Sequence, residues 1–184
     1  MAHPLVYDIV GKTFTNNAGA KFIVESTPIK NNRNQTQYIC VFESGWKCFA
    51  ASADIRSGKV KDMLHPTVFG AGMLGTSGRN AKAQGKVYWL WLGMIRRCYD
   101  TSAPFYKWYG GRGVTVCERW KRFDLFLKDV PNIPGYNKEK IEAGELELDK
   151  DLIDNSKNIY SPETCSFVTH KDNMQAKKTF LNKT

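Results

Sequence analysis

The stretch that decides the expected fold is ELELDKDLIDNSKNIYSPETCSFVTHKDNMQAKK, residues 145–178. Alternating apolar and polar side chains predict a strand over residues 145–152. Turn-forming residues follow at 154–157, and the β-branched and aromatic run at 159–168 predicts a strand that returns alongside the first. The sequence therefore predicts a β-hairpin near the C-terminal end.

A helix is expected directly after this hairpin, because Thr169 is a suitable N-cap for residues 170–178. On such a scaffold Asp149 and Asp151 project from one face of the first strand, and Asn173 projects from the first turn of the helix. Carboxylate and amide oxygens are hard ligands that suit Mg²⁺ or Mn²⁺, with phosphate and water completing the shell. The alternative for the two aspartates is that they are solvated charges on an edge strand.

Three motifs in this stretch resemble the ββα-metal unit of HNH-type (His-Me finger) endonucleases, particularly those of phages and mobile elements. They are LDKD at 148–151, NIYSPETC at 158–165 and THKDN at 169–173. Upstream segments are similar as well, so the resemblance covers most of the chain. It implies a metal-dependent, homing-endonuclease-like hydrolase, in which Asp149 is the metal carboxylate and Asn173 is the ligand from the helix.

Lys150 departs from this family pattern, because HNH nucleases usually carry here a histidine that deprotonates the attacking water. An unperturbed lysine, with a pKa of about 10.4, is a poor base near neutral pH, but as an ammonium ion it can clamp a phosphate. His170 is the other candidate base, and its alternative role is that of a surface residue at the helix start. The resemblance gives Asn158 the task of orienting the base or the hairpin, with a simple turn role as the alternative.

A basic and aromatic segment lies upstream of the hairpin. Apolar spacings of three or four predict a helix over 86–100, the glycines at 110–113 force a tight loop, and residues 118–130 are predicted to form one amphipathic helix. Residues 81–128 hold ten Lys or Arg against three Asp or Glu, a balance that can attract a polyanion. The alternatives are a solvated basic face and, for the aromatic residues, core packing. The candidate DNA contacts are Arg96, Arg97, Lys107, Arg112, Arg119, Lys121 and Arg122.

The N-terminal part has a different pattern. Residues 10–75 contain short apolar and β-branched runs separated by turn residues, which predict a small curled β module. A glycine-containing segment at 75–85 is expected to be a flexible linker, so that the boundary falls near residue 80. We therefore expect an α+β protein, with a small β-rich module at 1–80 that assists DNA binding and a helical, HNH-like domain at 81–184.

Composition narrows the classes of function. The chain of 184 residues has a formal net charge of +9, and residues 129–154 hold eight Asp or Glu against three Lys, which can collect a cation. Three histidines and five scattered cysteines make a zinc site unexpected, and dinucleotide-binding, P-loop and Gly-x-Ser-x-Gly patterns are missing. No apolar run suits a membrane span, and the N-terminus does not resemble a signal peptide. We expect a cytoplasmic protein, in a bacterial host cell if it is phage-encoded.

Two functions follow from these observations. The first is a phage-type HNH-like endonuclease that binds duplex DNA and cuts or nicks a phosphodiester with Mg²⁺ or Mn²⁺. The second is a catalytically lapsed, DNA-binding or host-factor-binding regulatory protein on the same scaffold. Lys150 is the residue that separates the two, because it occupies the place of the usual catalytic histidine.

Overall fold

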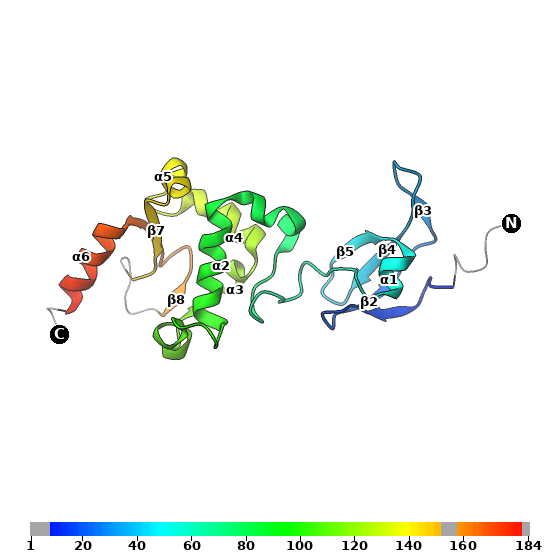
Figure 1. Cartoon of the computed structure of the whole chain (residues 1–184), viewed down its shortest axis with the longest axis horizontal. Helices are drawn as coiled ribbons and strands as arrows, with labels where there is room; N and C mark the ends of the chain where they lie inside the picture. The colour runs from blue at the N-terminus through cyan, green and yellow to red at the C-terminus, as the bar shows by residue number, and fades with distance from the viewer. Residues whose placement is uncertain (1–7, 152–157, 182–184) are drawn as a thin grey trace. The chain divides into compact units, whose positions relative to one another are not determined.

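The computed structural model describes residues 8–151 and 158–181, and the chain divides into two compact units between His65 and Pro66 (Figure 1). The predicted α+β class is confirmed. The division lies before the boundary expected near residue 80, because the intervening residues pack on the second unit. Val68 and Leu74 contact its core, and Thr76 donates two hydrogen bonds to Asp124, of 3.1 Å from its N–H and 2.9 Å from its hydroxyl.

The N-terminal unit is built on a small antiparallel sheet and one short helix. Strand β4 is central and pairs with β2, β3 and β5, while β1 pairs with β2. One face of the sheet is buried through alternate residues, including Phe22, Tyr38 and Phe42, together with Ile55 of the helix. The elements are β1 (Thr13–Thr15), β2 (Lys21–Val24), β3 (Ile29–Lys30), β4 (Thr36–Phe42), β5 (Lys47–Ala50) and α1 (Ser52–Arg56).

The second unit is centred on α2 (Lys86–Tyr99), as the apolar spacing predicts. Trp91 is fully buried and donates a hydrogen bond of 2.7 Å from its indole nitrogen to the carbonyl of Trp120. Trp89, by contrast, is 55% exposed, because the buried stripe runs through Tyr88, Trp91 and Ile95. Around α2 lie η2 (Gly75–Gln84), η3 (Tyr106–Trp108), η4 (Gly110–Arg112), β6 (Thr115–Val116), η5 (Val130–Asn132) and α5 (Lys138–Ala143).

Two predictions for this region are wrong in detail. The single helix expected at 118–130 is divided into α3 (Glu118–Lys121) and α4 (Phe123–Asp129), because Arg122 adopts an extended conformation. The cause is a β-bridge from Met73, whose N–H donates to Lys121 O at 2.8 Å and whose carbonyl accepts from Phe123 N at 2.9 Å. The expected flexible linker at 75–85 is instead the 3₁₀ segment η2.

The C-terminal elements form an antiparallel pair followed by a helix. Strand β7 (Leu146–Asp149) pairs with β9 (Ser166–Thr169), and α6 (His170–Leu181) begins directly afterwards (Figure 1). The second strand is shorter than expected, because β8 (Ile159–Tyr160) pairs in parallel with β6 instead. A turn held by the Thr164 hydroxyl, which donates to Ile159 O at 2.7 Å, separates β8 from β9. The turn predicted at 154–157 lies outside the described residues.

Candidate metal and nucleic-acid site

The β7–β9 pair and α6 position the predicted metal ligands. The register sets Asp149 opposite Ser166 at the end of β7, and Asn173 lies in the first turn of α6. Thr169 caps this helix as predicted, because its hydroxyl accepts a hydrogen bond of 3.2 Å from Asp172 N. Asp149 and Asn173 are both buried, with 8% of each residue exposed.

These two residues line one cavity, together with Asp151, Lys150 and Arg97. The cavity has a volume of about 270 Å³. The sequence thus predicted five residues that the fold brings together from three separate elements or their ends: α2, β7 and α6. The remaining walls include the rings of Tyr109 and Tyr160.

Glu147 is a lining residue that the sequence analysis did not single out. Its carboxylate accepts a hydrogen bond of 3.0 Å from the side-chain nitrogen of Asn173, and its other oxygen lies 2.9 Å from Nδ1 of His170. The missed signal was the strand period of two, which puts Glu147 on the same side of β7 as Asp149. With its nitrogen directed to Glu147, Asn173 has its amide oxygen to offer to a cation.

Lys150 is a buried member of the site, with 6% of the residue exposed. Its amine forms an ion pair with the carboxylate of Asp151, whose backbone N–H donates in turn to Asp149 Oδ1 at 2.8 Å. The amine of a lysine in such a pair donates hydrogen bonds. The geometry therefore favours the phosphate-clamp role over the role of base.

Arg97 contributes a second cation to the cavity. Its guanidinium carbon lies 5.3 Å from the ring centre of Tyr109 and 5.6 Å from that of Tyr160, and its Nη2 is 3.4 Å from the Tyr160 hydroxyl. Burial acts to lower the pKa of Arg97, but its electrostatic interactions with Tyr160 and Tyr109 outweigh this and raise the pKa above its ordinary value. Its Nε is buried without a hydrogen-bond partner among the described residues. A buried, permanently charged donor of this kind is suited to receive an anion.

The donor chemistry of the cavity fits a hard divalent cation. The residues that line it include Glu147, Asp149, Asp151 and Asn173, whose side chains carry oxygen atoms. Mg²⁺ usually takes only one or two protein carboxylates, with water and phosphate as its other ligands. Within residues 8–151 and 158–181, no three His, Cys, Asp or Glu side chains are grouped as a ready-made metal site. Three carboxylates against Lys150 and Arg97 leave a formal charge of −1, which one divalent cation would convert to +1. The loaded cavity would then attract a phosphate.

Four of the other predicted DNA contacts form ion pairs within the chain. Arg96 pairs with Asp100 at 3.2 Å, Lys121 with Glu118 at 2.5 Å, Arg122 with Asp124 at 2.8 Å, and Arg119 with Asp129 at 2.6 Å. Of these, Lys121 and Arg122 are the more enclosed, with 22% and 32% of their side chains exposed, and Arg122 helps to fasten η2 through its ion pair with Asp124, which accepts a hydrogen bond from Thr76. These arginines and the lysine therefore contribute to packing and local charge balance, and they are weaker candidates for DNA contact than Arg97.

Lys107 and Arg112 both lie close to an exposed tryptophan. Trp108 is 54% exposed, with the Lys107 amine 5.1 Å and the Arg112 guanidinium carbon 4.7 Å from the centre of a ring of its side chain. Gly110 allows the tight loop, because a Cβ at this position would lie 2.2 Å from the carbonyl oxygen of Cys98. This exposed aromatic and cationic group remains a candidate contact for nucleic acid.

The last two predicted catalytic residues differ in their placement. Nδ1 of His170 lies 2.9 Å from Oε1 of Glu147, and the His170 side chain is 75% exposed. Asn158 is exposed and joins the fold through its backbone carbonyl, which accepts from Thr115 N at 2.9 Å. In the described part of the chain, neither Asn158 nor His170 belongs to the residues that line the cavity, although His170 contacts the lining residue Glu147. The contacts of Asn158 therefore support the turn role more than the orientation of a base.

No helix among residues 8–151 and 158–181 combines the length and the apolar character needed to cross a membrane. Comparisons with protein-family models, with characterised proteins and with solved structures find no match to this chain.

Proposed function

We propose that this chain is an HNH-like DNA endonuclease of the phage type, which hydrolyses or nicks a phosphodiester of duplex DNA in the cavity beside β7 and α6. The observation that supports this proposal is that Asp149, Asn173, Lys150 and Arg97 line one cavity. A hard-cation ligand set and two cationic donors in the same space are what a phosphate ester and its metal require. The proposed location is the cytoplasm of a bacterial host.

In this proposal Asp149 and the amide oxygen of Asn173 hold Mg²⁺ or Mn²⁺, which supplies Lewis-acid stabilisation of the charge that develops on the phosphate. Arg97 and Lys150 orient the phosphate by donating hydrogen bonds to its oxygens. Because both are held in place before the substrate arrives, by the tyrosine rings and by Asp151, they stabilise the transition state with little reorganisation.

His170 is the proposed base. A hydrogen bond between Nδ1 and a carboxylate puts the ring proton on Nδ1 and makes Nε2 the atom that takes a proton from water. Glu147 would thus orient both His170 and Asn173, the first through Nδ1 and the second through its side-chain nitrogen. The base would then come from the start of α6. Lys150, at the position where HNH nucleases usually carry the catalytic histidine, would contact the phosphate instead.

The test is nicking of supercoiled plasmid by the purified protein in Mg²⁺ or Mn²⁺, compared for wild type, Asp149→Asn and Glu145→Gln. Asparagine keeps an acceptor for Asp151 N but removes the charge, so Asp149→Asn should abolish nicking while binding in EDTA stays within about 2-fold of wild type. Glu145 is an exposed carboxylate directly before β7, and its substitution should leave nicking unchanged. Nicking that survives in Asp149→Asn would refute the assignment of the site.

The alternative function is a lapsed nuclease that binds DNA or a host factor without cutting. The observation that favours it is the ion pair between Lys150 and Asp151, which occupies the place of the usual histidine. On this alternative neither metal produces cleavage of any plasmid, while a labelled duplex still shows salt-sensitive binding. That result would replace the first function by the second.

A further inference from the structure

The N-terminal unit carries a protruding β-ribbon, whereas the cavity described above belongs to the second unit. Strand β3 pairs with the first residues of β4, with Ile29 opposite Gln37 and Lys30 opposite Thr36, and the connecting turn extends beyond the main sheet (Figure 1). Between Ser26 and Phe42 the chain contains Lys30 and Arg33 and no acidic residue. The ribbon is therefore a locally cationic projection.

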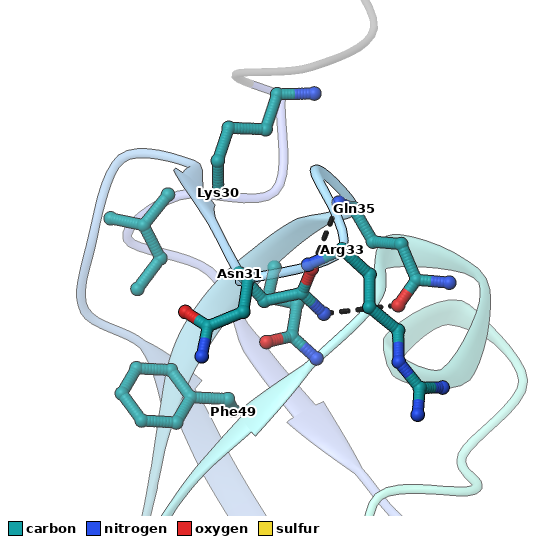
Figure 2. A pocket seen from close by; sticks show the side chains of 8 residues that line it. Lys30, Asn31, Arg33, Gln35 and Phe49 are labelled. Carbon is teal, nitrogen blue, oxygen red and sulfur yellow. Dashed lines mark hydrogen bonds between the residues drawn. The ribbon is translucent and has the colours of Figure 1, made fainter.

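The turn of the ribbon is held rigidly by its own side chains. Asn31 Oδ1 accepts hydrogen bonds of 2.9 Å from the backbone nitrogens of both Arg33 and Gln35, and Asn31 Nδ2 donates to Gln35 Oε1 at 3.0 Å (Figure 2). Lys30 adds bonds to Asn34 O at 3.2 Å and to the Thr36 hydroxyl at 2.9 Å. Asn31 and Lys30 are thus committed to the turn, which presents its remaining side chains on a fixed backbone.

Two exposed polar side chains at the tip have no such structural task. Asn32 and Arg33 are both exposed, and no ion pair of Arg33 is found among the described residues. Beside the ribbon, Phe49 of β5 is 58% exposed and Ile29 of β3 is 39% exposed, and they border the same hollow as the tip (Figure 2). The surface therefore combines a guanidinium, amides and apolar groups.

We propose that this ribbon enters the major groove of duplex DNA and reads base edges through Arg33 and Asn32. A two-stranded ribbon fits the major groove, where arginine pairs with the O6 and N7 atoms of guanine and asparagine with adenine. Phe49 and Ile29 offer apolar contact to thymine methyl groups. The absence of acidic residues from 26–42 favours a polyanion over a basic or neutral protein surface.

This inference rests on the proposed function in taking DNA as the substrate, but it assigns sequence recognition to a part of the chain distinct from the cavity. It predicts that cleavage chemistry and sequence choice respond to different substitutions. Arg33→Lys separates electrostatic attraction to DNA from recognition of guanine, because lysine keeps the positive charge and loses the bidentate hydrogen bonding. Since Arg33 is exposed on a turn, the exchange leaves the fold intact.

The experiment selects binding sites from a randomised duplex library with the full-length chain in EDTA and then measures affinities by fluorescence anisotropy. Wild type should enrich a guanine-containing consensus, and Arg33→Lys should bind random duplex within about 2-fold of wild type while its preference for the consensus falls about 10-fold or more. Replacing the consensus guanines by 7-deazaguanine, which removes the N7 acceptor from the major groove only, should weaken wild type and leave Arg33→Lys unaffected. Lys59→Ala, an exposed charge after α1, is the control and should keep the consensus.

The outcomes separate this inference from the proposed function. A library that yields no consensus, a consensus that Arg33→Lys retains, or equal binding to single strands would overturn the ribbon assignment, even if plasmid nicking depends on Asp149. Ribbon-dependent selection without any nicking would instead overturn the nuclease and leave the ribbon assignment intact. A protein that binds no DNA at all refutes both.

Discussion

Asp124 is predicted to fasten the start of η2 to the rest of the second unit, and the Asp124→Asn variant tests this. Its carboxylate accepts hydrogen bonds from Arg122 and from the N–H and hydroxyl of Thr76. Burial by itself would raise the pKa of Asp124, but these hydrogen bonds outweigh it and lower the pKa to about 2. The side chain is 3% exposed, so solvent screens the interaction only weakly.

The magnitude follows from the difference between the ordinary pKa of 3.8 and the value of about 2 in the folded protein. That difference corresponds to roughly 2 kcal/mol of stability. Because the folded pKa is the lower one, the contribution is fully present above about pH 5 and is lost as the pH falls towards 2. Asp124→Asn should therefore lower the free energy of unfolding by about 2 kcal/mol at pH 7 and by about half as much at pH 3.

Urea unfolding followed by tryptophan fluorescence measures this effect, since four of the five tryptophans lie in the second unit. Glu145→Gln, at an exposed carboxylate of the same unit, is the control and should change the free energy of unfolding by less than about 0.5 kcal/mol. A loss below about 0.5 kcal/mol for Asp124→Asn at pH 7, or a loss that stays constant down to pH 3, contradicts the reasoning.

Three further predictions concern packing, thiol reactivity and the candidate site. Gly110→Ala should lower the free energy of unfolding by more than about 2 kcal/mol, because its Cβ would lie 2.2 Å from Cys98 O. Gly93→Ala on α2 should instead stabilise the protein by up to about 1 kcal/mol, because the neighbouring Arg97 Nη1 would be 3.6 Å from its Cβ. Urea titration of both variants checks this. Burial raises the pKa of Cys98 to about 11 and that of Cys165 to about 12, so iodoacetamide at pH 8 should label both far more slowly in native than in urea-unfolded protein, and equal rates by mass spectrometry would disagree with this. Glu147→Gln should reduce plasmid nicking at least about 10-fold with unchanged binding in EDTA, because the carboxylate orients both His170 and Asn173; a variant that nicks at the wild-type rate removes Glu147 from the proposed mechanism.

Several features of the fold and of the candidate site were predictable because their signals are local. The spacing of apolar residues predicted α2, the alternation around Leu146 and Leu148 predicted β7, and Thr169 predicted the start of α6. The same logic could have found Glu147, which lies two positions before Asp149 in the same strand. Period and capping depend on neighbours in the chain, so the sequence carries them directly.

Other features depended on partners that lie far away along the chain. The sequence did not indicate that Met73 would bridge to Arg122 and divide the helix expected at 118–130, nor that Ile159 would pair with β6. It also identified seven basic residues as equal candidates for DNA contact, whereas the fold separates Arg97, which faces a cavity, from Arg96, which pairs with Asp100.

The residue types therefore determined which side chains could bind a cation or a phosphate, because charge and donor chemistry belong to each side chain alone. Only the tertiary structure decided that Arg97 from α2, Asp149 from β7 and Asn173 from α6 would border one space. The physical reason is that long-range pairing and core packing minimise exposed apolar surface and unpaired backbone groups over the whole unit. This minimisation depends on contacts across the whole unit, so it cannot be read from any short window of sequence.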